Sequence, residues 1–269
     1  MTARIHPLAV VEEGARLGVG VVVGAFCHIG GSVEIGDNVE LLSHVVIEGE
    51  TRLGPRCRVF PFACLGAPSQ DLKSRTHEGR LVIGADCIIR ESVTVNLGSS
   101  EGDRQTRIGD GCALLANAHV AHDCLIGDGV VLSNAVLLGG HVQIGDYSMI
   151  GGASAVHQHV RIGAHAFVGG LAGVEGDVIP FALAGGNRAH LFGLNLVGLR
   201  RRNFTQQRIA RLKAVYQTLF ESGDMVFAER LAALVTESGE DADAAAIIDF
   251  LREAGKRPLC MPRRREPAR

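Results

Sequence analysis

A period of six residues dominates this chain. Every sixth residue over 108–174 is Ile, Leu or Val, and the same holds over 5–65 and 83–95. Gly often follows the aliphatic residue, and a small residue usually stands two positions before it. Because alternate residues of a strand share one face, the aliphatic and the small residue of each repeat both point inward.

This period predicts a parallel β-helix, the architecture of hexapeptide repeats, in which three repeats form one triangular coil. Residues 18 apart then stack along one edge. We assign residues 1–187 to the β-helix, with insertions near 66–80 and 96–107, and residues 188–269 to a C-terminal α-helical domain. In that domain we expect helices from Thr205 to Gly223, near 225–236 and near 242–254.

The two insertions are polar and rich in turn-forming residues. A solenoid places its insertions on the surface, often at the binding face, although an insertion without a role is the simpler alternative.

Composition agrees with a repetitive core and excludes several classes of protein. The 269 residues contain 35 Gly and no Trp, and 46% are hydrophobic. A net charge of −2 gives no broad basic field for nucleic acid. There is no apolar run of membrane-spanning length and no secretion signal at the N-terminus, so we expect a cytoplasmic protein.

The seven cysteines contain no C-x-x-C pair, which argues against a metal or disulfide framework. Cys64 and Cys260 lie outside the repeat pattern, and their neighbours do not indicate a reactive thiol. The others occupy the small inward position and are interpreted as buried apolar residues; they are Cys27, Cys57, Cys87, Cys112 and Cys124.

Histidines are unusually dense in the segment 117–124. His122 lies two residues after the inward Val120 and should therefore point outward with an exposed imidazole. Adding 18 to 122 and to 123 gives the residues expected to stack above them. Adding 18 once gives Gly140 and His141, and adding 18 again gives Gln158 and His159. The cluster predicted on one edge consists of His122, Asp123, Gly140, His141 and Gln158, with His159 next to Gln158 and His119 on the adjacent turn.

Such a cluster contains the groups that general base catalysis requires. An exposed imidazole suits general base catalysis, a neighbouring carboxylate can orient it, and a Gly N–H can stabilise an oxyanion. A stacked ladder of polar residues without a function is the alternative. Carbonic anhydrases of one class share the β-helix, and their metal motif includes two His five residues apart. No pair here has that spacing, so no metal is expected.

Several segments resemble those of the UDP-N-acetylglucosamine acyltransferases of lipid A biosynthesis, which belong to the hexapeptide-repeat transferases. The similarity runs in register from about residue 6 into the helical tail. It is carried by Ser69-Gln70-Asp71-Leu72-Lys73, Arg90-Glu91-Ser92-Val93-Thr94, Asn117 to Cys124, Gly151-Gly152, Ala155-Val156-His157-Gln158, Gly185-Gly186-Asn187 and Phe192-Gly193-Leu194-Asn195.

The resemblance implies a left-handed β-helix and a homotrimer with active sites between subunits. It also implies transfer of a 3-hydroxyacyl group from acyl carrier protein to the 3-hydroxyl of UDP-N-acetylglucosamine, the first step of lipid A biosynthesis. The donor is a phosphopantetheine thioester on the carrier protein, so no further cofactor is implied.

The resemblance also assigns roles to residues. His122 would be the general base, Asp123 would orient it, and the Gly140 N–H would stabilise the oxyanion. Gly170 would limit the length of the acyl chain. The residues implied in contacts with the substrates are Asp71, Lys73, His119, His141, His157 and Gln158, with Asn195 and Arg202 on the nucleotide and Arg200 and Arg201 on the carrier protein. Leu97 stands where the family usually has Arg, so no role is transferred there.

Four alternative functions differ from this one in what they require of the sequence. The acceptor sugar could carry an amine instead of a hydroxyl at its 3-position. The related N-acyltransferase of the same pathway has an extra uridine-binding domain before its β-helix, whereas the repeats here begin at Ile5. A small-substrate acetyltransferase using acetyl-coenzyme A would lack this register of motifs. A non-catalytic scaffold would not require the His122–Asp123 cluster.

Overall fold

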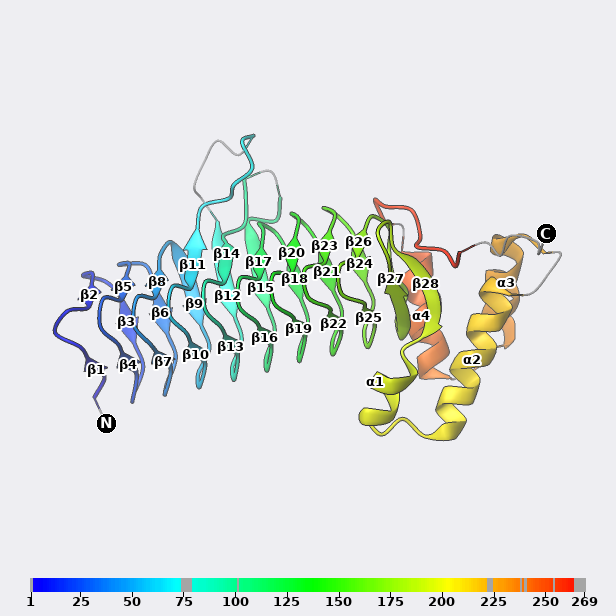
Figure 1. Ribbon diagram of the computed structural model, residues 1–269, viewed down its shortest axis with the longest axis horizontal. Helices are drawn as coiled ribbons and strands as arrows, with labels where there is room; N and C mark the ends of the chain where they lie inside the picture. The colour runs from blue at the N-terminus through cyan, green and yellow to red at the C-terminus, as the bar shows by residue number, and fades with distance from the viewer. Residues whose placement is uncertain are drawn as a thin grey trace.

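The computed structural model describes residues 2–73, 79–100, 102–221, 225–237, 239, 241–253 and 255–263. Its larger part is a three-sided prism of parallel strands, most of them two residues long (Figure 1). Successive strands pass through sheet 1, sheet 2 and sheet 3 in turn, so strands three apart in the chain are hydrogen-bonded neighbours. His119 pairs with Leu137 and Val120 with Leu138, which confirms the predicted stacking at intervals of 18.

The strands of each sheet follow in spatial order. Sheet 1 contains β1 (Arg4–Ile5), β4 (Val22–Val23), β7 (Glu40–Leu41), β10 (Arg58–Val59), β13 (Ile88–Ile89), β16 (Ala113–Leu114), β19 (Val131–Leu132), β22 (Met149–Ile150), β25 (Phe167–Val168), β27 (Ala182–Gly185) and β28 (His190–Leu194). Sheet 2 contains β2 (Val10–Val11), β5 (His28–Ile29), β8 (Val46–Ile47), β11 (Cys64–Ala67), β14 (Thr94–Asn96), β17 (His119–Val120), β20 (Leu137–Leu138), β23 (Ala155–Val156) and β26 (Gly173–Val174). Sheet 3 contains β3 (Arg16–Leu17), β6 (Glu34–Ile35), β9 (Glu50–Leu53), β12 (Arg80–Ile83), β15 (Gln105–Ile108), β18 (Leu125–Ile126), β21 (Gln143–Ile144) and β24 (Arg161–Ile162).

The core is the narrow interior of the prism. The repeat aliphatics fill it, and Ile29, Leu114 and Val168 are fully buried. The small inward residues lie beside them, and their polar atoms bond to backbone carbonyls. The Sγ of Cys124 donates to the Gly139 carbonyl at 3.2 Å, and Ser148 Oγ donates to the Gly163 carbonyl at 2.8 Å.

The interpretation of the five inward cysteines is confirmed: each is buried and none forms a disulfide. Their thiols occupy the same position as the Ser148 hydroxyl, so they act as small core residues. Cys260, which the repeat pattern did not place, is also buried, and Cys64 is half-buried.

The three edges of the prism are named here by the sheets they join. Both insertions leave from edge 2–3: one lies between β11 and β12, the other between β14 and β15. They rise together above that edge in Figure 1. Leu97 connects the starts of the two insertions. Its N–H donates to the Ala67 carbonyl at 2.9 Å, and its side chain is buried beside Gly49. A long charged Arg at this position would have to be accommodated in that apolar contact.

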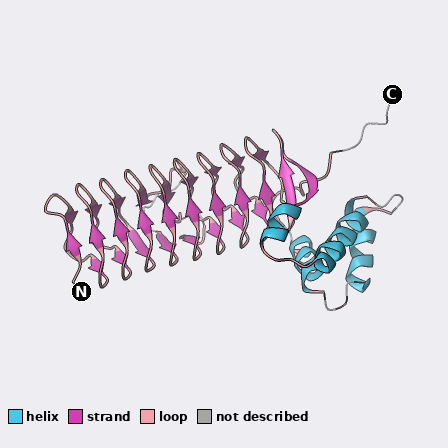
Figure 2. Cartoon of the chain, turned by 60° about the horizontal axis from the view of Figure 1, so that its bottom comes forward, coloured by secondary structure: helices cyan, strands magenta, loops and turns pink. Residues whose placement is uncertain are grey.

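The C-terminal region adds strands and helices at one end of the prism (Figures 1 and 2). The coil continues beyond the last hexad, because β27 pairs with β25, and β28 then returns antiparallel to β27. The sequence did not predict this hairpin or the short helix after it. The helices are α1 (Leu196–Arg201), α2 (Gln206–Phe220), α3 (Phe227–Glu237) and α4 (Ala242–Arg252).

Thr205 caps α2 as predicted, its hydroxyl accepting a hydrogen bond from the Arg208 N–H at 3.2 Å. Gly223 and Ala254, the expected ends of two helices, lie outside the described residues. After α4 the chain returns over the end of the prism, where the Cys260 N–H donates to the Asp177 carbonyl at 2.8 Å. Among the described residues, no helix has the length and apolar character needed to cross a membrane.

Candidate active site

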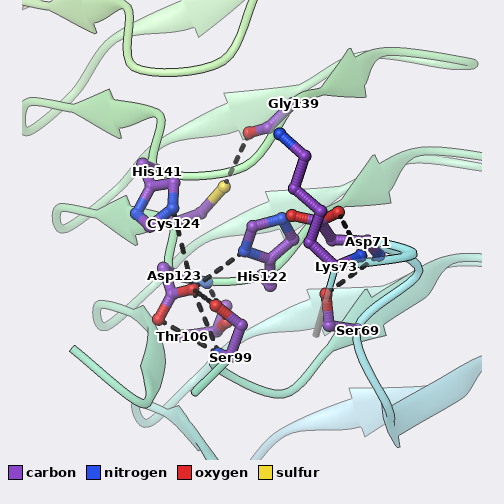
Figure 3. A network of polar contacts seen from close by, with 10 residues as sticks. All are labelled: Ser69, Asp71, Lys73, Ser99, Thr106, His122, Asp123, Cys124, Gly139 and His141. Atoms are coloured by element: carbon purple, nitrogen blue, oxygen red, sulfur yellow. Dashed lines mark hydrogen bonds and ion pairs between the residues drawn. The ribbon is translucent and has the colours of Figure 1, made fainter. Parts of the chain in front are cut away.

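His122 and Asp123 occupy the turn between β17 and β18, at edge 2–3 of the prism. The Nδ1 atom of His122 lies 2.8 Å from an Asp123 carboxylate oxygen (Figure 3). This bond favours the tautomer with the proton on Nδ1, which leaves Nε2 free to accept a proton. The expectation of an exposed imidazole was wrong: the His122 side chain is only 10% exposed, because it packs beneath Gly140 of the next coil.

Asp123 is the more deeply buried partner, with a side chain 1% exposed. Its carboxylate also accepts hydrogen bonds from the Ser99 hydroxyl at 2.6 Å and from the Ser99 N–H at 3.1 Å. Burial alone would raise the pKa of this carboxyl, but the bonds from His122 and Ser99 outweigh burial, so its pKa is lowered. Asp123 is therefore an anion at neutral pH, able to orient the His122 ring.

Gly140 lies directly against the His122 ring. A Cβ atom at Gly140 would come within 2.5 Å of His122 Nε2 and Cε1, so only glycine fits here without displacing the ring. In the described part of the chain, no hydrogen bond to the Gly140 N–H is found. The Gly140 backbone therefore adjoins the proton-accepting nitrogen, and the role of its N–H as an oxyanion donor stays a prediction.

Histidines continue along the same edge. His141 stacks on His159 with ring centroids 4.5 Å apart, and its Nε2 lies 4.0 Å from the Asp123 carboxylate. Burial lowers the pKa of both rings, and for His159 the neighbouring His141 adds to the effect. His119, on β17, is bonded through Nδ1 to Thr94 Oγ1 at 2.8 Å, and burial lowers its pKa. At neutral pH, uncharged His141 and His159 therefore line the edge, and uncharged His119 lies on the adjoining strand.

The remaining predicted substrate contacts on this edge are more open. His157 and Gln158 are exposed in the turn between β23 and β24. Asp71 and Lys73 belong to the first insertion, where the Asp71 carboxylate accepts the Lys73 N–H at 3.0 Å. In the view of Figure 3, the His122 imidazole lies between Asp123 and these two side chains.

The predicted nucleotide ligands lie elsewhere, beside sheet 1. A cavity of about 780 Å³ there is lined by residues that include Tyr147, His165, Phe167, Asn195 and Arg202. The Arg202 guanidinium lies 4.2 Å from the Tyr147 ring centroid. Asn195 caps α1, accepting the Gly198 N–H at 3.0 Å and donating to the His165 carbonyl. The chain therefore does not bring Asn195 and Arg202 onto the edge that carries His122.

Three other predicted site residues are also separate from His122. Gly170 lies at edge 1–2, in the turn between β25 and β26, and is exposed. Arg200 and Arg201 end α1 and are exposed, and Arg201 also lines the cavity beside sheet 1.

One group among the described residues has the spacing of metal ligands: His122, Asp123 and His141. The Asp123 oxygens are already engaged by Ser99 and His122, so we interpret the group as a site for proton transfer. The absence of a metal stays a prediction.

Sequence reasoning missed two residues that hold Asp123. Ser99 lies in the second insertion, and Thr106 lies on β15, where its hydroxyl accepts the Asp123 N–H at 2.9 Å. Ser99 is out of register with Asp123 because the insertion interrupts the repeat, whereas Thr106 lies 17 residues before Asp123, one position away from the stacking interval of 18. The polar insertion was the only available signal for Ser99.

Comparison with known proteins identifies the family of the chain. Residues 177–260 match the family described as UDP N-acetylglucosamine O-acyltransferase, domain 2, and residues 105–140 match the bacterial transferase hexapeptide repeats. A curated protein from Mesorhizobium japonicum, named acyl-[acyl-carrier-protein]–UDP-N-acetylglucosamine O-acyltransferase, is 55% identical over 96% of this chain and 92% of its own length. The chain belongs to this acyltransferase family.

Solved structures of the family agree in fold. The UDP-N-acetylglucosamine acyltransferase from Campylobacter jejuni superposes with a TM-score of 0.91 at 39% identity, covering 97% of this chain and all of its own. The enzyme from Francisella novicida gives 0.92 at 34% identity, with 96% and 94% covered. The predicted fold, a left-handed β-helix followed by α-helices, is confirmed.

Proposed function

We propose that this acyltransferase moves a 3-hydroxyacyl group from acyl carrier protein to the 3-hydroxyl of UDP-N-acetylglucosamine, the first step of lipid A biosynthesis. The observation that carries the proposal is the arrangement of His122, Asp123 and Gly140, found in a chain of this family. The acyl donor is a phosphopantetheine thioester, and no other cofactor takes part. The reaction takes place in the cytoplasm.

His122 Nε2 accepts the proton of the sugar 3-hydroxyl as the oxygen attacks the thioester carbonyl carbon. Asp123 fixes the ring and stabilises the imidazolium that forms. The carbonyl oxygen becomes negatively charged and is met by the Gly140 N–H. The carbon–sulfur bond then breaks, and the imidazolium returns its proton to the departing sulfur. The products are the sugar ester and the carrier protein with a free thiol.

A second copy of the chain completes the substrate site in this proposal. His122 lies at edge 2–3, whereas Asn195 and Arg202 adjoin the cavity beside sheet 1. The outward positions of sheets 1 and 2 include apolar residues that are 39–50% exposed, namely Ile88, Leu137 and Met149. Most outward residues of sheet 3 are charged or polar, such as Arg16, Glu34 and Arg52; its exceptions include Leu125, and sheet 1 also carries the charged pair Glu40 and Arg58. A homotrimer joined through sheets 1 and 2 buries the apolar faces and brings the two regions together.

Leu72 supports this assembly. It is fully exposed in the isolated chain, between Asp71 and Lys73 of the first insertion. In the proposed trimer this segment packs against a second chain, and the Leu72 side chain is buried there.

The direct test is a reaction of the purified protein with UDP-N-acetylglucosamine and 3-hydroxyacyl carrier protein, followed by mass spectrometry. The expected products are one ester of the sugar and one free carrier thiol per turnover. A parallel reaction with the 3-amino analogue of the sugar tests the acceptor. Absence of ester in the first reaction would contradict the proposal, and preferential acylation of the amine would reassign the acceptor.

A further inference from the structure

Ser99, in the second insertion, hydrogen-bonds to Asp123 at edge 2–3. Its hydroxyl lies 2.6 Å from Asp123 Oδ2, and its N–H lies 3.1 and 3.2 Å from the two carboxylate oxygens. Ser99 is itself 1% exposed. The carboxylate that orients His122 therefore receives two donors from a residue with no place in the hexapeptide repeat.

The insertion is built to keep Ser99 in this position. Leu97 anchors its start in an apolar contact beside Gly49. Gly102 then passes over the carboxylate, because a Cβ atom there would lie 2.5 Å from Asp123 Cγ, and its N–H donates to the Ser99 carbonyl at 3.3 Å. Ser99 and Gly102 thus both lie against Asp123, whose side chain is 1% exposed.

We propose that Ser99 is a positioning residue of this acyltransferase, which acts on the His122 base through the Asp123 carboxylate. With Oδ2 shared between Ser99 and His122, the carboxylate cannot rotate without breaking a short bond in a buried setting. The Nδ1 proton of His122 is thereby held toward Asp123, and Nε2 toward the substrate. The inference rests on the proposed role of His122 as the base.

Hydrogen bonds to a buried charged group are among the stronger ones in proteins, which sets the size of the expected effect. Ser99→Ala removes the hydroxyl and leaves the backbone donor. We expect kcat to fall about tenfold and the KM values of both substrates to stay within about twofold. Ser99→Thr restores the hydroxyl and should recover most of the lost kcat. Ser100→Ala, the neighbouring position in the same insertion, is the matched control and should behave as wild type.

A double-mutant cycle separates positioning from a general structural role. In an Asp123→Asn background, Ser99→Ala should change kcat by less than about twofold, because Ser99 acts only through the carboxylate. If Ser99→Ala assembles poorly, Ser99→Cys keeps the volume with a weaker donor and takes its place in the cycle.

Two results would overturn the inference: an equal loss from Ser99→Ala in both backgrounds, or no loss in either. His122→Ala is assayed beside these variants. If that variant were active, the proposed base would be wrong; if it is inactive while Ser99→Ala is neutral, only the role of Ser99 is wrong.

Discussion

The two regions that carry the predicted site residues differ in how they are built. At edge 2–3, His122, Asp123 and Ser99 are buried and bonded to one another. Beside sheet 1, Arg202 is exposed, lies over the Tyr147 ring and lines the cavity. The first region has its geometry fixed within one chain before any substrate arrives. The second leaves a charged group accessible at the end of a long side chain.

The proposed function gives the two regions different tasks. A proton acceptor must be held in orientation at the moment of reaction, which requires buried partners. A nucleotide must enter and leave, which favours an open cavity with exposed cations. Mutations at edge 2–3 should therefore change kcat, whereas mutations beside sheet 1 should change KM.

The largest effect is expected at His122. His122→Ala should lower kcat by about 10²–10⁴-fold, because a general base contributes that much. The measurement is steady-state kinetics with both substrates, together with size-exclusion chromatography to check the assembly. A variant with nearly unchanged kcat would remove the distinction between the two regions.

The next test asks whether the two regions meet across subunits. His122→Ala chains and Arg202→Ala chains are denatured together, refolded and assayed at a nucleotide sugar concentration below KM. If each site takes His122 from one chain and Arg202 from another, about a quarter of the sites in the mixed oligomer are intact. Activity should then exceed the average of the two separate variants severalfold. A mixture that matches this average would place both residues of a site on one chain.

The stacking of residues at edge 2–3 was largely predictable from the sequence, because this edge follows the repeat. Intervals of 18 residues placed Gly140 and His141 above His122 and Asp123, and the structure has them there. The same rule put the aliphatic residues inside, where Ile89 and Leu132 are fully buried. A period is a local property of the chain, so it can be read without knowing any distant contact.

The contacts that were missed are those that break the period. Ser99 reaches Asp123 across 24 residues, and the insertion between them has no repeat from which to count. The burial of His122 depends on Gly140 in the coil above, which its own outward position could not indicate. The pairing of Cys260 with Asp177 joins the C-terminus to the prism over a still longer interval.

A smaller effect is expected at the arginines that end α1. Arg200 and Arg201 are exposed, whereas Arg208 and Arg211 nearby are paired with Asp243 and Asp241. Reversing both exposed charges to Glu should raise the KM for acyl carrier protein roughly tenfold, which is far more than the change in the KM for the nucleotide sugar.

For the wild type, the KM for the carrier protein should rise with salt, because exposed charges are screened. Arg188→Glu, on the turn of the β27–β28 hairpin, changes the net charge by half as much, and it serves as the control for a charge reversal away from α1. An effect confined to the nucleotide sugar would assign these arginines to the sheet 1 cavity instead.

The smallest effect concerns Gly170, which belongs to neither region. It is exposed at edge 1–2, and an added Cβ would meet only the backbone of Gly152, at 3.2 Å from its oxygen. A longer side chain should therefore fit with a small adjustment and project outward; in the proposed trimer it would occupy the end of the acyl-binding groove.

We expect the wild type to prefer the longer 3-hydroxyacyl donors and Gly170→Met to shift the preference toward shorter ones. Each methylene excluded from an apolar groove forfeits about 0.8 kcal/mol, which is about fourfold in relative kcat/KM. The measurement is a competition between donors of different length. Leu171→Met, the neighbouring exposed position, should leave the preference unchanged. A wild-type preference for short donors, or equal selectivity in both variants, would mean that another residue sets the chain length.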